Sequence, residues 1–68
     1  MQNRIQKLRK ERKMTQSDLA QELEVTRQTI ISLESGRYNA SLILAYKIAR
    51  FFDLTIEEVF IFDGEDEK

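Results

Sequence analysis

Apolar residues recur along this chain at intervals of three and four positions, which is the spacing of an α-helix with one apolar face. In the first such run, Ile5, Leu8 and Arg12 share a face, and most of the remaining positions are charged. Asn3 precedes this face, where a side-chain N-cap is expected. The pattern therefore predicts a helix over about residues 3–13.

Two shorter apolar runs follow, and each is preceded by a threonine. Thr15 has an acidic residue, Asp18, three positions further on, which is a capping box with aspartate in place of glutamate. Thr26 opens the next run, and Gly36 follows it at a C′ position, where glycine adopts positive φ without strain. We therefore predict short helices at about residues 16–23 and 27–35, with core-facing residues Leu19, Ala20, Leu23, Ile30 and Leu33.

The rest of the chain predicts one longer helix and one very short helix. Ser41 stands before the longer helix as its N-cap, and Thr55 stands before the short one. Proline is absent and glycine occurs only twice, which favours an all-α protein. We expect a compact five-helix domain over residues 1–62, followed by an acidic, disordered tail over residues 63–68. The apolar face of the longer helix comprises Leu42, Ala45, Ile48, Ala49 and Phe52.

The composition removes several classes of protein. The chain has 68 residues with no cysteine and no histidine, so it offers no disulfide, no thiolate or imidazole zinc site and no histidine general base. No run of about 18 apolar residues is present, and the charged stretch from Arg4 to Lys13 is unlike a signal peptide. We expect a cytoplasmic protein that is not an enzyme, has no cofactor or metal, and binds neither a membrane nor a small-molecule ligand.

Charge is distributed unevenly along the chain. The net charge is −1, but residues 1–52 hold ten Lys or Arg and five Asp or Glu, whereas residues 53–68 hold one lysine and seven acids. The two parts therefore carry +5 and −6. A basic body suits nucleic acid, although ordinary solvated charge explains the same counts. The acidic end either screens the basic face against non-specific DNA or is simply a solubilising tail.

The second and third predicted helices are joined by a turn too short for a relaxed antiparallel hairpin. Ala20 is small enough for a close approach of the two helices, and Val25 in the turn can fill the corner between them. A helix-turn-helix has this pattern, with its second helix in the major groove of DNA. An ordinary αα-hairpin of a small bundle has it as well, so spacing alone leaves both interpretations open.

Four short runs together resemble one known family. They are MTQSDLA at residues 14–20, VTRQTI at 25–30, LESGR at 33–37 and SL at 41–42. The combined string resembles the lambda-repressor/Cro-like helix-turn-helix family, also called the XRE family, over about residues 3–60. The resemblance implies a short regulator of transcription, here expected to be a repressor, that binds double-stranded DNA as a homodimer on a near-palindromic operator.

The resemblance also implies which side chains contact bases. Arg27, Gln28 and Ser32 match family positions that face the major groove, and Thr26 caps the same helix within reach of DNA. The chemistry is suitable, because arginine can bind guanine O6 and N7, and glutamine can bind adenine N6 and N7.

A second set of positions matches residues that bind the DNA backbone in the family. Gln16, at the start of the second helix, resembles a glutamine that binds a phosphate and braces the recognition helix; a plain surface glutamine is the alternative. Thr29 is expected to contact backbone rather than bases. The loop after the third helix supplies further donors to phosphate oxygens, namely Arg37, Tyr38 and Asn39.

The resemblance further implies a structural ion pair, and the chain departs from the family pattern at two places. Arg9 and Glu34 match a partly buried pair between the first and third helices. Ala40 stands where the family usually has proline, so the loop should be less stiff. Ile31 stands where a polar residue is common, and either contacts thymine methyl groups or flanks the core.

A dimer interface is expected near the end of the domain. Ile43, Tyr46 and Phe51 add apolar surface to the fourth helix, and an apolar run closes the domain. Single exposed apolar residues are also ordinary on monomers. We place the interface on the fifth helix and on Val59, Phe60, Ile61 and Phe62, with the end of the fourth helix assisting.

A function of a different class remains open. The same fold can serve as a protein-interaction module, such as an antitoxin-like subunit, whose apolar surface binds another protein. The presence of Gln16, Arg27, Gln28 and Arg37 at the DNA-contacting positions favours DNA over this alternative.

Overall fold

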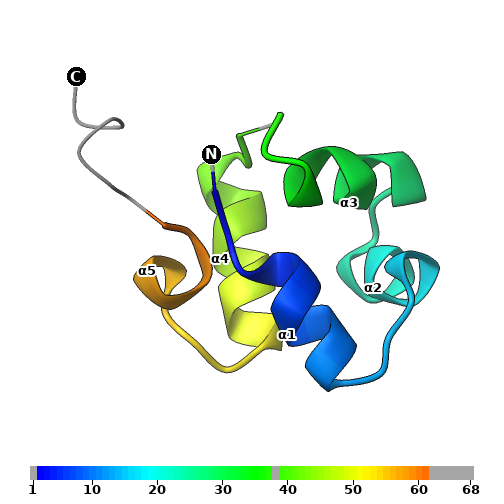
Figure 1. The fold of residues 1–68 in the computed structure, drawn as a ribbon. Coiled ribbons are helices and arrows are strands. Elements are labelled where there is room, and N and C mark those ends of the chain that lie inside the picture. The colour runs from blue at the N-terminus through cyan, green and yellow to red at the C-terminus, as the bar shows by residue number, and fades with distance from the viewer. Residues whose placement is uncertain (1, 38, 62–68) are drawn as a thin grey trace.

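The protein folds into five helices in the part of the chain that the computed structural model describes, residues 2–37 and 39–61. Figure 1 shows α4 behind α1, with α5 on one side and the α2–α3 pair on the other. Apart from these helices, the described residues form one isolated antiparallel bridge, between Asn3 and Phe60. The prediction of an all-α, five-helix domain is confirmed. The helices are α1 (Ile5–Glu11), α2 (Gln16–Leu23), α3 (Arg27–Glu34), α4 (Leu42–Phe51) and α5 (Ile56–Val59).

Hydroxyl side chains begin four of the five helices, as the sequence predicts. The Thr15 hydroxyl accepts the Asp18 backbone N–H at 3.0 Å, and the Asp18 carboxylate accepts the Thr15 backbone N–H at 2.9 Å. The second hydrogen bond holds the pKa of Asp18 below its ordinary value, since it stabilises the ionised carboxylate. Thr26, Ser41 and Thr55 accept backbone N–H groups in the same way at the starts of α3, α4 and α5.

The first helix begins later than the sequence predicts. Arg4 occupies the N-cap position and makes no side-chain capping bond, and the helix itself starts at Ile5. Asn3 nevertheless supplies an acceptor, because its Oδ1 receives the Ile5 backbone N–H at 3.1 Å. The backbone of this segment is held by α5, since the Arg4 N–H donates to the Val59 carbonyl at 2.7 Å.

Three charged residues adopt the left-handed conformation that favours glycine. Gly36 has φ 80°, as expected for the end of α3. Lys13, Glu24 and Asp53 have φ of 57°, 60° and 59°, at the ends of α1, α2 and α4 respectively. A side chain with a Cβ costs roughly 1–2 kcal/mol in this conformation. The turn of the helix-turn-helix is therefore closed at Glu24 without a glycine.

The core joins all five helices. Its fully buried large side chains come from α1 (Ile5), α2 (Leu19 and Leu23), α3 (Ile30 and Leu33), α4 (Ile48) and α5 (Val59). Ala20 is 4% exposed where α2 meets α3, and Val25 packs against the same core from the turn. This packing agrees with the prediction that Ala20 allows the two helices to approach closely and that Val25 fills the corner between them.

The buried face of α4 agrees with the prediction at four of its five residues and differs at Leu42. Leu44, Ala45, Ile48, Ala49 and Phe52 are buried, whereas Leu42 is 78% exposed. Leu42 is exposed because it is the first residue of α4, and Leu44, half a turn later, occupies the core position instead. Phe51, expected at the surface, packs partly against the core.

Arg12 joins the end of α1 to the end of α4. Its guanidinium lies 5.3 Å from the ring centroid of Phe51 and 5.0 Å from that of Phe52. It also donates to the Phe51 carbonyl at 3.1 Å. The apolar pattern placed Arg12 on the inward side of α1, and this stacking on two aromatic rings accounts for an arginine there.

Two residues expected at a dimer interface lie in the core instead. Val59 is 0% exposed and Phe60 is 2% exposed, so this chain already covers both side chains. The apolar run pairs with the N-terminal segment through the Asn3–Phe60 bridge and the Ile61 N–H, which donates to the Gln2 carbonyl at 2.9 Å. Ile61 is half-buried. The expectations for Phe62 and for the tail, residues 63–68, lie outside the described residues.

Candidate nucleic-acid interface

The third helix has a buried apolar face and an exposed polar start. Ile30 and Leu33 are fully buried, whereas Arg27 and Gln28, in its first turn, are exposed. Ser32, one turn further along, is half-buried. An exposed guanidinium and an exposed amide on successive residues can enter a groove together.

The start of α3 is held by two hydroxyl groups. The Thr26 hydroxyl accepts the Thr29 backbone N–H at 3.3 Å, and the two threonine hydroxyl oxygens lie 3.0 Å apart. Thr26 is exposed and Thr29 is half-buried. These hydrogen bonds cap the first turn of α3, which carries Arg27 and Gln28.

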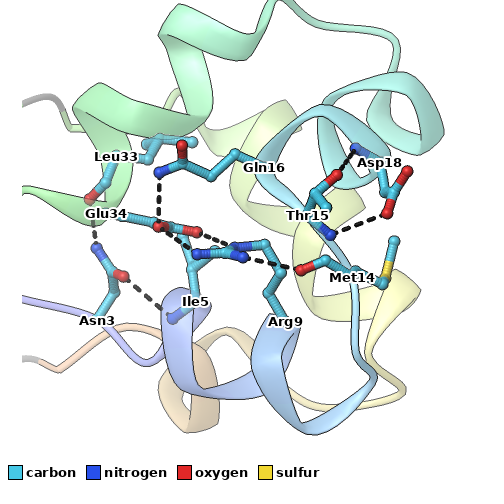
Figure 2. Close-up of polar contacts among 9 residues, drawn as sticks. All are labelled: Asn3, Ile5, Arg9, Met14, Thr15, Gln16, Asp18, Leu33 and Glu34. Atoms are coloured by element: carbon cyan, nitrogen blue, oxygen red, sulfur yellow. Dashed lines mark hydrogen bonds and ion pairs between the residues drawn. The ribbon is translucent and has the colours of Figure 1, made fainter.

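A bidentate ion pair supports the other end of α3. Arg9 Nε lies 2.7 Å from Glu34 Oε2, and Arg9 Nη2 donates to Glu34 Oε1 at 3.1 Å (Figure 2). Arg9 Nη1 donates to the Met14 carbonyl at 2.8 Å. The side chains are 8% and 5% exposed, and the hydrogen bonds that Arg9 donates to Glu34 raise the pKa of Arg9 above its ordinary value. Like any arginine, Arg9 is charged at every physiological pH.

Gln16 also joins this ion pair; the resemblance implies a contact that braces α3, but not this partner. The Gln16 side-chain amide donates from Nε2 to Glu34 Oε1 at 3.2 Å, so one carboxylate holds both Arg9 and Gln16 (Figure 2). Gln16 is half-buried. An amide nitrogen carries two N–H groups, so this contact leaves one for another acceptor.

Asn3 forms a second support for the end of α3. Its Nδ2 donates to the Leu33 carbonyl at 2.8 Å while its Oδ1 caps Ile5 (Figure 2). The end of α3 is therefore bound to the N-terminal segment through Asn3 and to α1 through Arg9. This fixes the angle at which Arg27 and Gln28 are presented.

The loop after α3 carries the remaining predicted contacts. Arg37 and Asn39 are exposed, and Tyr38 lies outside the described residues. Ala40 packs partly against the core without the proline of the family pattern. Ile31, on α3, is half-buried, which leaves part of its side chain beside the polar face.

Two further features of the described residues bear on function. None of the helices there has both the length and the apolar character to cross a membrane. No group of three or more acidic side chains in that part of the chain is placed to hold a metal ion.

Comparison with known proteins agrees with this geometry. A family model described as helix-turn-helix matches residues 5–59. An HTH-type transcriptional regulator of Archaeoglobus fulgidus is 53% identical over 66 residues, which cover 97% of this chain and 93% of the relative. One from Methanothermobacter thermautotrophicus is 51% identical over the full length of both chains, and one from Bacillus subtilis is 38% identical over 97% of this chain and all of the relative. The chain belongs to the XRE-type helix-turn-helix family of DNA-binding transcriptional regulators, which is not a family of enzymes.

Proposed function

We propose that this protein is a sequence-specific repressor that acts in the cytoplasm and binds a near-palindromic operator as a homodimer, with α3 in the major groove. The observation that carries the proposal is the exposure of Arg27 and Gln28 at the start of a helix that is anchored in the core by Ile30 and Leu33. Repression requires only that the protein occupy promoter DNA, which a DNA-binding domain can do by itself.

The proposed base contacts come from the first two turns of α3. Arg27 is assigned to a guanine and Gln28 to an adenine, each in bidentate fashion. Ser32 and Thr26 flank them on the same helix and are assigned to neighbouring base edges. The Thr26 hydroxyl accepts the Thr29 N–H and shares one proton with the Thr29 hydroxyl, which leaves it one further hydrogen bond, as donor or as acceptor, for DNA.

The proposed backbone contacts lie on both sides of α3. Gln16 is assigned to a phosphate through its second amide N–H, since the first is held by Glu34. Thr29 and the residues after α3 are assigned to phosphates on the other side. These are Arg37, Asn39 and, outside the described residues, Tyr38.

The affinity for DNA is expected to fall steeply as salt is raised. Cationic side chains that neutralise phosphates release condensed counterions, and each such contact contributes about −0.9 to the slope of log affinity against log salt. The measurement is a binding titration with a labelled duplex from about 50 to 200 mM salt. An affinity that stays flat across this range would contradict the proposed mode of binding.

The proposed dimer interface is moved from the end of the domain to the start of α4. The large exposed apolar residues in the described part of the chain are Leu42, Ile43 and Tyr46, at 78%, 75% and 57% exposure. They lie within the first five residues of one helix, and Ile61 remains the candidate from the closing run. A twofold dimer of this kind would set two α3 helices about 34 Å apart, one turn of DNA.

The dimer is tested by Ile43→Lys, which places a charge on this face without adding repulsion toward DNA. We expect sedimentation velocity to show a monomer, and binding to a duplex with two half-sites to weaken, while binding to a single half-site stays unchanged. An unchanged dimer would reject this face. Capture of a different protein by the same face, with no shift of any DNA in a gel, would favour the interaction-module alternative.

A further inference from the structure

We propose that Lys10 of α1 and Lys13, directly after it, also bind the DNA backbone, in addition to the residues of α2, α3 and the following loop assigned above. The inference deepens the proposed DNA-binding function and rests on it. Its ligand class is the phosphodiester of duplex DNA, bound without regard to base sequence.

The site is a shallow hollow between α1 and the first turns of α2 and α3. Lys10 and Lys13 line it from α1 and the residues after it, Gln16 lines it from α2, and Arg27 lines it from α3. Arg9 lies at its base, but its guanidinium is bound to Glu34 and to the Met14 carbonyl. The free positive charge of the hollow therefore comes from the two lysines and Arg27.

These three cations are not paired with a carboxylate, because the two nearest carboxylates are already bound, Glu34 to Arg9 and Asp18 to the Thr15 backbone. Lys10, Lys13 and Arg27 are exposed, and within the described residues their side chains form no ion pair or hydrogen bond. No aspartate or glutamate in that part of the chain lines the hollow. Asp18, in the first turn of α2, turns its carboxylate back to the Thr15 backbone N–H at 2.9 Å.

The unpaired cations belong to the basic part of the chain. Residues 1–52 carry a charge of +5, and three of their cations line this one hollow. Like charges gathered without acidic partners repel one another, and an anion that binds among them removes the repulsion. A polyanion is the ligand that this arrangement fits.

The position of Arg27 connects the hollow to duplex DNA. Arg27 belongs both to the exposed face of α3 and to the wall of the hollow. A duplex whose major groove receives Arg27 must carry its sugar-phosphate backbone past Lys10 and Lys13. Lysine ammonium groups are mobile point charges without a fixed fork of donors, so they suit phosphates rather than base edges.

The test compares three lysines of similar exposure in or directly after α1. Lys10→Gln and Lys13→Asn each remove one cation from the hollow; asparagine is used at position 13 because it tolerates positive φ. Lys7→Gln removes the same charge from an exposed residue of α1 that does not line the hollow. All three variants are first checked for unchanged thermal unfolding.

We expect Lys10→Gln and Lys13→Asn to weaken binding to the operator and to an unrelated duplex by the same factor. Each should reduce the magnitude of the salt slope by about 0.9, the contribution of one phosphate contact. Lys7→Gln should keep the wild-type affinity and slope. Equal losses in all three variants would show a general charge effect and overturn the inference, as would wild-type slopes for Lys10→Gln and Lys13→Asn.

Arg27→Ala separates this inference from the proposed function. If that variant loses base preference while both hollow variants behave as wild type, only the α1 site is wrong. If the wild-type protein shows no duplex binding, or Arg27→Ala keeps the full base preference, the proposed function itself fails.

Discussion

Replacing Arg9 with methionine is expected to lower the free energy of unfolding by about 3–5 kcal/mol, because it leaves a buried carboxylate without its cation. The Glu34 side chain is 5% exposed and cannot turn to water. The Met14 carbonyl loses its guanidinium donor in the same step. Urea unfolding monitored by circular dichroism measures the difference.

The double variant Arg9→Met, Glu34→Leu is the matched control. Removing both charges leaves an apolar pair of similar volume, so most of the lost stability should return. A single variant within about 1 kcal/mol of wild type would mean that the pair behaves like an exposed one, and would contradict its burial. Glu34 also holds Gln16, so DNA affinity should fall in the double variant even where the fold is restored.

Substituting Arg27 by alanine is expected to remove discrimination at one or two base pairs without affecting the fold. A bidentate arginine–guanine contact contributes about 1–3 kcal/mol of discrimination, roughly a 5- to 150-fold loss in affinity ratio. Gln28→Ala should act in the same way at a neighbouring base pair. Both residues are exposed, so thermal unfolding should be unchanged. Competition binding against single-base operator variants measures the ratio.

Arg37→Ala provides the comparison for these variants. It removes one cation from the loop after α3, so it should weaken binding to operator and unrelated DNA by a similar factor. A loss of base preference in Arg37→Ala, or unfolding of Arg27→Ala, would contradict the division of the surface into base-reading and backbone-binding parts.

The helices and their starts could be predicted from the sequence because the interactions that set them are local. Thr15 and Asp18 are three positions apart, and a capping box connects only the ends of one turn. The left-handed residues Lys13, Glu24 and Asp53 could not be predicted in this way. Their conformation is imposed by the packing of the helices on either side, and none of them is a glycine.

The end of the chain shows where pattern alone is insufficient. An apolar run can be core or interface, and Val59 and Phe60 were assigned to the interface. The deciding contact pairs Phe60 with Asn3, at the opposite end of the sequence. The spacing of residues along the chain does not indicate such a pairing. The exposed apolar face at the start of α4 was likewise identified only in the folded structure.

Gln16 and Glu34 were each identified from the sequence, but the hydrogen bond between them was not. The resemblance assigned to Gln16 a phosphate and a contact that braces the third helix, and to Glu34 an ion pair with Arg9, without connecting the two. In the fold, one carboxylate holds both Arg9 and Gln16, because the start of α2 packs against the end of α3. Hydrogen bonds across 18 positions depend on helix packing, which neither periodicity nor motif spacing describes.

The central claim is that the exposed face of α3 reads the bases of duplex DNA. Selection from a random duplex library with the wild-type protein, in parallel with Arg27→Ala, tests it most directly. We predict one enriched motif with two symmetric half-sites for the wild type, and for the variant the same motif with preference lost at one or two pairs in each half. Enrichment of no motif, or of an identical motif by both proteins, would contradict the claim.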